Sequence, residues 1–362
     1  MATIAPENVA GQVQVAGGVD THLDNHTAAA VDAAGRLLGH RQFPATAAGY
    51  RQLLAWLRAF GTLLVVGIEG TGVYGAGLAR HLAGEGVAML EVDRPDRKMR
   101  RFAGKSDPLD AEAAARTALT RTRTGTPKDR TGQVEALRNL RVARHSAVDQ
   151  RADCQRRIKA LIVTAPEPLR AQLRGLTGVK LISTCAELRP DPARISEPEQ
   201  AAKTALRALA RRHRALTEEI DDLDALIGPL VAQINPDLLA CNGVGIDVAG
   251  QLLVTVGQNA DRLHSEPAFA MLCGVAPIPA SSGKTHRHRL NRGGDRQANA
   301  ALYRVVLCRM RWDPRTRAYV ERRTKEGLAK KDIIRCLKRM IARELYYVLR
   351  PTTPTENLAS AA

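Results

Sequence analysis

Apolar positions in the first ninety or so residues follow two different spacings, which predict strands and helices in turn. Short apolar runs, such as Leu63–Ile68, are typical of buried strands, whereas repeats of three and four residues indicate an amphipathic helix. In chain order the expected elements are strands over Val13–Asp20, Thr27–Val31 and Leu37–Phe43, a helix over Gly49–Phe60, a strand over Leu63–Ile68, a helix over Gly75–Gly84 and a strand over Val87–Val92. The segment Asp32–Gly35 is expected to form the turn between the second and third strands.

This β-β-β-α-β-α-β order is that of the ribonuclease H fold, so we expect an α/β domain of that class over residues 1–125. A nucleotide-binding α/β domain is the competing interpretation. The Gly-x-Gly-x-x-Gly phosphate loop that such a domain needs after its first strand is missing here, which counts against it.

The rest of the chain lacks strong strand signals and is expected to be mainly helical. Within residues 126–235, apolar spacing predicts long helices over Val134–Leu161 and Ala201–Leu230, as an antiparallel pair, a dimerising coiled coil or an ordinary helical core. Within residues 236–350, Leu238–Leu253 resembles a helix-hairpin-helix whose glycine turn can present backbone N–H groups to a DNA phosphate, with a plain helix-turn-helix as the alternative. Residues 351–362 have few apolar side chains and are expected to be disordered.

Positive charge is concentrated toward the C-terminal end. The formal net charge is +17, yet residues 1–120 contain 12 basic and 12 acidic side chains, whereas residues 281–350 contain 20 Lys and Arg against 6 Asp and Glu. A local cationic field suits a polyphosphate partner, because each neutralised phosphate releases condensed counterions. This segment is therefore expected to bind nucleic acid, and a charged surface without a ligand is the alternative.

The cysteines and the hydropathy of the chain exclude several protein classes. Six cysteines lie far apart, with no C-x-x-C pair and no histidine at zinc-site spacing, so neither a zinc knuckle nor a disulfide framework is expected. A reducing cytosol is the natural location for such a chain. With no signal peptide and no apolar run of about eighteen residues, membrane insertion is not expected.

Four acidic residues lie next to predicted elements of the N-terminal domain. Asp20 follows the first strand in GGVDTH, and Glu69 ends the buried strand in LLVVGIEGTG. If these strands are neighbours in one sheet, their carboxylates can converge at a common edge. Asp107 and Asp110 are three residues apart in KSDPLDAEAAARTAL, where Asp107 is expected to be the N-cap of a helix and Pro108 its first residue. This spacing directs both aspartates toward one face of the helix.

Four carboxylates gathered from distant segments would repel one another, and a bound divalent cation is the simplest compensation. Hard oxygen ligands favour Mg²⁺ or Mn²⁺. Two such ions can activate a nucleophile and stabilise the leaving oxygen in phosphodiester chemistry. Any one of these acids alone is more often a helix cap or a surface charge. The prediction of a metal site therefore rests on the complete set of four acids and their order along the fold.

A second group of candidate residues lies in CGVAPIPASSGKTHRHRLNRGGDRQANAALY, residues 273–303. It contains two adjacent hydroxyls, Ser281 and Ser282, before a flexible Gly283. The basic side chains expected to contact nucleic acid are Lys284, Arg287, Arg289, Arg292 and Arg296. A serine that attacks a phosphodiester needs such cations, and His286 and His288 are possible proton carriers. A loop that only grips phosphate is the alternative interpretation.

The motifs GGVDTH, GIEGTGVYG, KSDPLDA, the serine segment and RRTKEGLAKKDIIRCLKR together resemble the DEDD transposases of bacterial insertion sequences, which are similar to serine recombinases guided by a bridge RNA. The resemblance extends over nearly the whole chain. It implies a RuvC-like domain, akin to Holliday-junction resolvases, whose four acids map onto Asp20, Glu69, Asp107 and Asp110 as metal ligands. It also implies a C-terminal transposase domain whose DNA-linking serine falls on Ser282, with Ser281 directly before it.

The same resemblance implies partners that no residue pattern demonstrates. The acids of one subunit would meet the serine domain of another in a dimer or tetramer, with the central helices as tether, and a non-coding bridge RNA would guide the protein to DNA in the nucleoid of a bacterial cytoplasm. The chain departs from many members in having Asp295 where they have Asn. It also has Ala298-Asn299 where others have Leu-Arg, as in one branch of the family.

Three functional hypotheses follow. The first is a transposase that cleaves and rejoins DNA through a serine–phosphate intermediate, aided by Mg²⁺. The second is a structure-specific nuclease of the Holliday-junction type that uses the acids and water, with the serine loop only gripping phosphate. The third is a nucleic-acid-binding protein without enzymatic activity, in which the acids are structural.

Overall fold

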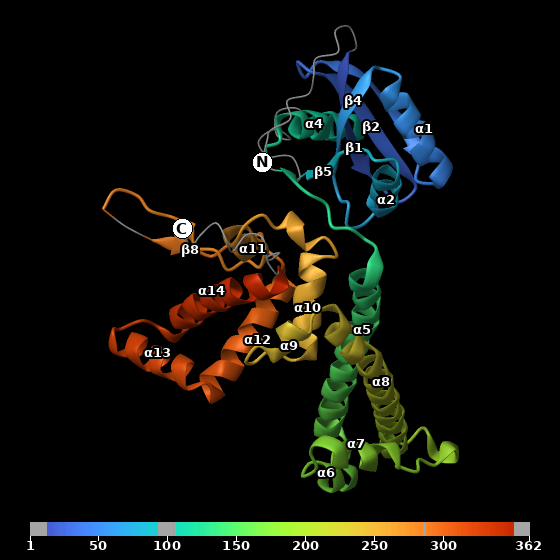
Figure 1. The fold of residues 1–362 in the computed structure, drawn as a ribbon. Coiled ribbons are helices and arrows are strands. Elements are labelled where there is room, and N and C mark those ends of the chain that lie inside the picture. The colour runs from blue at the N-terminus through green and yellow to red at the C-terminus, as the bar shows by residue number, and fades with distance from the viewer. Residues whose placement is uncertain (1–12, 93–103, 105, 123, 285–286, 351–362) are drawn as a thin grey trace. The chain divides into compact units, whose positions relative to one another are not determined.

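The computed structural model describes residues 13–92, 104, 106–122, 124–284 and 287–350 (Figure 1). The chain divides into two compact units, the first made of residues 1–131 and 256–264 and the second of residues 132–255 and 265–362. The predicted disordered tail, residues 351–362, and the candidate proton carrier His286 lie outside the described residues. We refer to the two parts as unit 1 and unit 2.

Unit 1 is built on a six-stranded mixed sheet in the order β3-β2-β1-β4-β5-β6. Its strands are β1 (Gln14–Thr21), β2 (Asn25–Asp32), β3 (Leu37–Pro44), β4 (Thr62–Ile68), β5 (Met89–Val92) and β6 (Thr124–Gly125). The first three strands form an antiparallel meander, and β4 lies parallel to β1 on its other side with Val19 opposite Ile68. The central pair β1–β4 therefore places the ends of two parallel strands side by side.

Helices cover both faces of this sheet. They are α1 (Ala47–Arg58), α2 (Ala76–Gly84) and α4 (Asp107–Thr120). Val15 and Val19 of β1 pack in one apolar cluster with leucines of α1 and α2, whereas Ala16 packs with alanines of α4 in another. The period-two alternation of β1 thus divides the strand between two cores. By the same alternation Gly18 and Asp20 fall on the α4 face.

Helix α4 lies unusually close to the sheet because glycines underlie it. A Cβ on Gly18 would lie 2.1 Å from the backbone nitrogen of Ala115, and a Cβ on Gly67 of β4 would lie 2.6 Å from the carbonyl oxygen of Ala114. The buried face of α4 consists of Ala111, Ala114, Ala115 and Ala118 around Asp110. Small residues on both sides allow the helix backbone to rest on the strand backbone, and this fixes where the helix begins relative to Asp20.

Two details of unit 1 differ from the sequence-based expectation. The N-cap of α4 is Ser106, so Asp107 is the first helical residue and Pro108 the second, and the prediction of Asp107 as the cap is wrong by one position. Proline is as acceptable in either position of the first turn, because the N–H it removes has no intrahelical partner. The short strand β6, antiparallel to β5, was not predicted, since two residues carry no periodic pattern.

Unit 2 begins with a long antiparallel helix pair (Figure 1). Helix α5 (Gly132–Thr164) and helix α8 (Pro198–Ile234) pack along their length, with α6 (Glu167–Leu173) and α7 (Gly178–Ala186) between them in the chain. Ile158, Leu206 and Ala210 anchor an apolar cluster with α6 and α7, and Cys154 and Ile220 belong to a neighbouring cluster. The predicted pair of long helices is confirmed as an antiparallel pair within one subunit.

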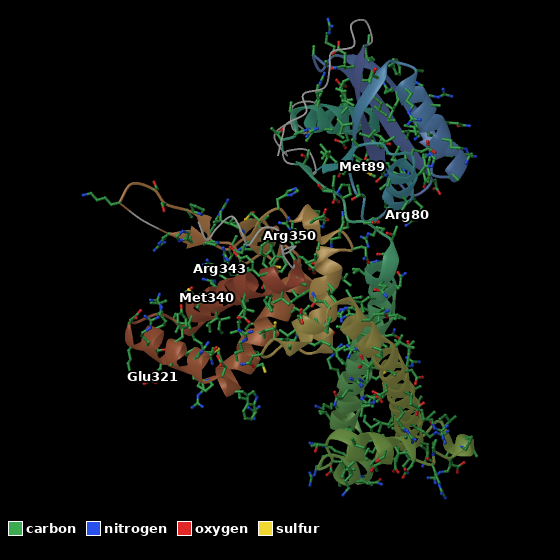
Figure 2. All side chains as sticks on the ribbon, viewed as in Figure 1. Arg80, Met89, Glu321, Met340, Arg343 and Arg350 are labelled. Atoms are coloured by element: carbon green, nitrogen blue, oxygen red, sulfur yellow. The ribbon has the colours of Figure 1, made fainter. Side chains whose placement is uncertain are left out.

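The remainder of unit 2 is mainly helical, with a two-stranded hairpin. Its elements are α9 (Pro236–Ala240), α10 (Ile246–Val256), α11 (Glu266–Leu272), β7 (Ile278–Pro279), β8 (His288–Arg289), α12 (Arg296–Trp312), α13 (Pro314–Lys325) and α14 (Lys330–Leu349). A short 3₁₀ turn at Pro192–Arg194 lies between α7 and α8 in the chain, and another at Ala260–Arg262 belongs to unit 1. Figure 2 shows side chains such as Met340 and Arg343 along α14 and Glu321 on α13.

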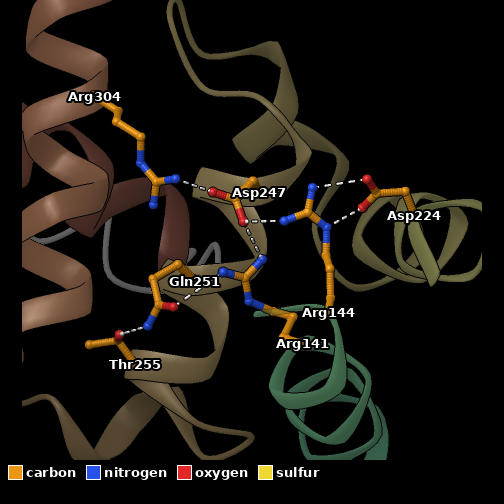
Figure 3. A network of polar contacts seen from close by, with 7 residues as sticks. All are labelled: Arg141, Arg144, Asp224, Asp247, Gln251, Thr255 and Arg304. Carbon is orange, nitrogen blue, oxygen red and sulfur yellow. Dashed lines mark hydrogen bonds and ion pairs between the residues drawn. The ribbon is translucent and has the colours of Figure 1, made fainter. Parts of the chain in front are cut away.

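A polar network ties the helix pair to the C-terminal helices (Figure 3). Asp247 of α10 accepts a hydrogen bond from Arg141 at 3.0 Å, is paired with Arg304 of α12, and lies 3.6 Å from Arg144. Arg144 in turn donates to Asp224 of α8. Burial alone would raise the pKa of Asp247, but Arg141 and Arg304 outweigh it and hold that pKa below its ordinary value.

The observed folds confirm the predicted class, an α/β domain of ribonuclease H type followed by a mainly helical region. Each strand and helix predicted between residues 13 and 92 is present, with ends that shift by a few residues. Among the helices described, each is too short or too polar to span a lipid bilayer.

Replacing Gly18 with Ala should destabilise unit 1, because the added Cβ clashes with backbone atoms of α4 that have no freedom to move aside. We expect a loss of about 1–3 kcal/mol in the free energy of unfolding. Urea titration followed by Trp56 fluorescence, in a Trp312→Phe background, measures it. The control is Gly84→Ala, where a Cβ meets nothing within 4 Å, and which should leave stability unchanged or raise it. Equal midpoints for wild type and Gly18→Ala would contradict the close contact.

Replacing Asp247 with Asn should destabilise unit 2, because three arginines then face an uncharged amide. The expected loss is about 1–3 kcal/mol, the usual cost of removing the charged partner of such hydrogen bonds. Denaturation followed by circular dichroism reports it. Asp222→Asn, an exposed acid on α8, is the matched control and should change stability by less than about 0.5 kcal/mol. Equal losses in both variants would show that the network contributes nothing.

Candidate active site

The end of β1 carries one of the two buried acids of the expected set, the other being Asp110. Asp20 is 8% exposed, and its neighbour Thr21 donates a hydrogen bond from Oγ1 to the carbonyl oxygen of Glu69 at 2.7 Å. The backbone N–H of Glu69 donates to the carbonyl of Val19 at 3.1 Å. These two bonds hold the ends of β1 and β4 together, so the positions of Asp20 and Glu69 are fixed by the sheet.

A histidine joins Asp20 to the start of α4. Nε2 of His22 lies 3.2 Å from Oδ2 of Asp20 and 3.5 Å from Oδ1 of Asp107. Potential ligand atoms of Asp20, His22 and Asp107 all lie within 4.8 Å of one another. Two of the four predicted acids, from segments far apart in the sequence, are thus brought to a single point together with a histidine.

The other two predicted acids lie nearby but outside this group. Asp110 is buried in the first turn of α4, one turn beyond Ser106, and its charge acts on Asp20. Glu69 directly follows β4 and, by strand alternation, falls on the α4 face with Asp20. The group of ligand atoms within 4.8 Å includes neither Asp110 nor Glu69.

Electrostatics at Asp20 indicate a site in which charge is not fully compensated. Burial raises the pKa of the Asp20 carboxyl, the His22 contact opposes that rise, and the charges of Asp107 and Asp110 add to it. A divalent cation among these groups would favour the ionised form and reverse the repulsion. The donor set of carboxylates with one imidazole nitrogen fits a divalent metal ion, and this is the observation on which a metal site rests.

A shallow hollow opens beside this group. Its volume is about 350 Å³, and its lining residues are His22, Leu23, Asp24, Asn25, Gln42, Tyr74 and Asp107. Tyr74 is 51% exposed and belongs to the loop between β4 and α2. Because His22 and Asp107 form part of the wall, a ligand in the hollow would touch the acidic group directly.

His22 is the residue that sequence reasoning missed. It is the last residue of the motif GGVDTH, from which only Asp20 was predicted as a ligand. The signal was the spacing: residues i and i+2 of an extended segment point to the same side, so a histidine two positions after a strand-end aspartate shares its face.

The two candidate serines lie at the tip of the β7–β8 hairpin in unit 2. Ile278 pairs with Arg289 and Pro279 with His288, and the N–H of Ala280 donates to the carbonyl of Arg287 at 2.8 Å. The chain turns back through Gly283, whose φ of +55° favours glycine. The sequence placed both serines next to a flexible glycine, and the hairpin presents them to solvent.

The two hydroxyls have different surroundings. Oγ of Ser281 accepts a hydrogen bond from the Arg287 N–H at 3.2 Å and is 3.4 Å from its carbonyl oxygen, so it braces the hairpin. Ser282 is exposed, and its hydroxyl has no partner among the residues that the structure describes. Ser281 is thus tied into the hairpin, whereas Ser282 is not hydrogen-bonded within the described residues.

The predicted nucleic-acid contacts surround this hairpin. Every one of them is exposed, and none has a carboxylate within 4.0 Å in the described part of the chain; they are Lys284, Arg287, Arg289, Arg292 and Arg296. Several other arginines of unit 2 have acidic partners, such as Arg309 with Glu344 at 2.7 Å and Arg339 with Glu266. The charge of the hairpin is thus open to an external anion.

The base of the hairpin is anchored tightly. A Cβ on Gly294 would lie 2.3 Å from the nitrogen of Gly274, so two backbone segments touch there. Asp295 caps α12 by accepting hydrogen bonds from the N–H groups of Gln297 and Ala298, and its other oxygen accepts from Thr255 at 2.8 Å. Asp and Asn are equally suitable helix N-caps, so Asp295 performs a structural role at the start of α12.

Comparison with known proteins matches both regions. A family model described as a transposase matches residues 17–165, and a second, described as the transposase IS116/IS110/IS902 family, matches residues 236–321. The chain is 30% identical over 158 residues to an uncharacterized 42 kDa protein of insertion element IS900 from Mycobacterium paratuberculosis. It is 32% identical over 149 residues to an uncharacterized 43.6 kDa protein of insertion element IS110 from Streptomyces coelicolor.

These two alignments cover 42% and 40% of the present chain, and the chain spans 39% and 36% of the length of these relatives. The two family models include the carboxylate–histidine group in unit 1 and the serine hairpin in unit 2. With its RNase H-like sheet followed by a helical region, the chain belongs to the IS110 family of DEDD insertion-sequence transposases.

Proposed function

We propose that this protein cleaves and rejoins DNA, using metal-bound acids of unit 1 and a serine nucleophile of unit 2. The observation that carries the proposal is the meeting of Asp20 and Asp107 at one nitrogen of His22. A buried acid with a purely structural role is normally neutralised by Arg or Lys. Buried Asp20 instead lies near two further acids and a half-exposed histidine. Such an arrangement suits a cation-binding centre.

Asp20, His22 and Asp107 would hold a divalent ion, with Asp110 and Glu69 beside them to bind or orient further ligands. When bound, such an ion offsets the negative charge that develops on phosphoryl oxygens. The carboxylates favour Mg²⁺ or Mn²⁺, and the imidazole nitrogen shifts the preference toward Mn²⁺. The sheet edge and the first turn of α4 would position these ligands around the ion.

In the proposed cleavage step, Oγ of Ser282 attacks a phosphorus atom of DNA. An O–P bond to serine forms, and the P–O bond to one sugar breaks. The serine hydroxyl proton passes to the solvent or to His288, and the departing sugar oxygen takes up a proton. Exposed cations of the hairpin stabilise the added charge. In rejoining, a sugar hydroxyl attacks the serine phosphodiester and Oγ leaves, so the number of phosphodiester bonds is conserved.

The partners proposed for this activity are the two element ends and a target DNA, a non-coding bridge RNA, and a second copy of the chain. The concentration of unpaired cations on unit 2 supports a nucleic-acid partner. Because the acids belong to unit 1 and the serines to unit 2, a composite site built from two subunits is compatible with the chain's organisation. We propose that the protein acts in the bacterial cytoplasm, on the nucleoid.

Removing the Asp20 carboxylate should weaken metal binding. We expect Asp20→Asn to lower the affinity of the full chain for Mn²⁺ by at least about tenfold, and His22→Ala to lower it by a smaller factor. Titration of Mn²⁺ by electron paramagnetic resonance measures both. Glu85→Gln, an exposed acid of unit 1 outside the group, is the control and should bind as wild type does. Unaltered affinity in Asp20→Asn would remove the basis for a metal centre here.

The serine step predicts a covalent adduct. When the protein is expressed with its flanking element DNA and any RNA encoded there, denaturing purification should recover DNA attached to wild type, Ser281→Ala and the control Ser146→Ala. Ser282→Ala should yield none, because of the two hairpin serines only Ser282 is without a hydrogen-bond partner among the described residues. An adduct that persists in Ser282→Ala would refute its role. Cleaved DNA with free 5′-phosphates and no adduct in any variant would favour a water-using nuclease.

A further inference from the structure

Two cavities in unit 2 adjoin each other next to the serine hairpin. Their volumes are about 520 and 490 Å³, within the range of small-ligand pockets. They share the lining residues Gly274, Leu290, Asn291, Arg335 and Lys338. Lys338 of α14 is therefore at the junction of the two, on a wall formed by a helix and not by a mobile loop.

The ammonium group of Lys338 is held in a defined position. Its Nζ donates a hydrogen bond to Oδ1 of Asn299 at 2.7 Å. The Asn299 amide is itself fixed, because its Nδ2 donates to the carbonyl oxygens of Cys273 and Gly274 at 3.0 and 3.1 Å. An ammonium group has three N–H donors, so this contact leaves donor capacity for a ligand in the cavities that Lys338 lines.

The charge of Lys338 is not compensated within the described residues. No carboxylate there lies within 4.0 Å of Lys338, whereas its neighbour Arg339 is paired with Glu266 and Arg335 with Asp332. Burial lowers the pKa of Lys338, and the positive charge of Arg335 lowers it further. A half-buried cation without an acidic partner costs free energy, and a bound anion recovers it.

The remaining walls have two kinds of surface. One cavity has apolar surface from Val275, Pro277, Met340 and the ring of Tyr319. The basic residues that line one or both cavities besides Lys338 are Arg289, Arg292, Arg296, Lys331, Arg335 and Arg339. A cationic wall beside an apolar one matches the two halves of a nucleotide, a phosphate and a base with its sugar.

We propose that these adjoining cavities form a nucleotide subsite, in which Lys338 binds a backbone phosphate of an unpaired DNA strand and the apolar wall receives the attached nucleoside. The identification of the strand as DNA rests on the proposed function, while the subsite itself rests on the cavities and on Lys338. Because His288 and Arg289 of strand β8 line one cavity and Arg292 lines the other, a strand held in this subsite would lie beside the hairpin that carries the serines. Lys338 is a binding residue in this account and takes no part in bond breaking.

Binding of a single-stranded oligothymidylate of about twenty nucleotides tests the subsite. The full chain, in EDTA so that no metal contributes, is titrated at several NaCl concentrations. We expect Lys338→Met to weaken binding about tenfold and to reduce the slope of log affinity against log salt by about 0.7, the release of one counterion. Lys338→Arg should retain most of the slope. Lys330→Met, the same change on the same helix outside both cavities, is the control and should bind as wild type does.

Each outcome of this experiment decides the proposal. It is overturned if Lys338→Met keeps the wild-type slope with an unchanged melting temperature, or if Lys330→Met loses as much as Lys338→Met. It is also overturned if thymidine monophosphate and inorganic phosphate bind in a Lys338-dependent way while the oligonucleotide slope is unaffected, since the ligand is then a free anion. Loss of slope together with a persistent adduct in Ser282→Ala would leave the subsite standing and refute only the serine step.

Discussion

The contact of α4 with the bare backbone of β1 and β4 determines where the acids of unit 1 can lie. A helix on a sheet is normally held off by side chains, but at Gly18 and Gly67 there are none to intervene, and the facing helix residues are alanines. The helix backbone therefore rests on the strands. Because Asp20 lies two residues beyond Gly18 on the same face, the first turn of α4 brings Asp107 to within 3.5 Å of the histidine that also contacts Asp20.

Much of the fold of unit 1 was predictable, because short segments of the sequence are enough to identify its strands and helices. Short apolar runs identified both β1 and β4, and these runs end at Asp20 and Glu69, so a common edge for the two acids was expected. The contribution of His22 was not predicted, although its two-residue spacing from Asp20 was visible. The role of Gly18 also escaped prediction, since a glycine in a strand does not reveal which helix will lie against it.

In unit 2, composition predicted less of what the structure shows than local sequence did in unit 1. The surplus of Lys and Arg over residues 281–350 predicted a nucleic-acid partner, but composition treats all cations alike. The structure separates them: Arg304, Arg309 and Arg339 are committed to carboxylates within the unit, whereas the hairpin cations face solvent. Lys338 differs from both groups, as a half-buried cation whose described partner is a neutral amide. Only packing reveals that distinction.

The proposed function requires that acids from distant segments meet around a divalent ion in the folded subunit. Crystals of the full chain grown with Mn²⁺ and measured at the manganese absorption edge test it directly. The account predicts an anomalous peak bonded to oxygens of Asp20 and Asp107. A structure in which these carboxylates point into separate environments, with no peak between them at saturating Mn²⁺, would contradict it.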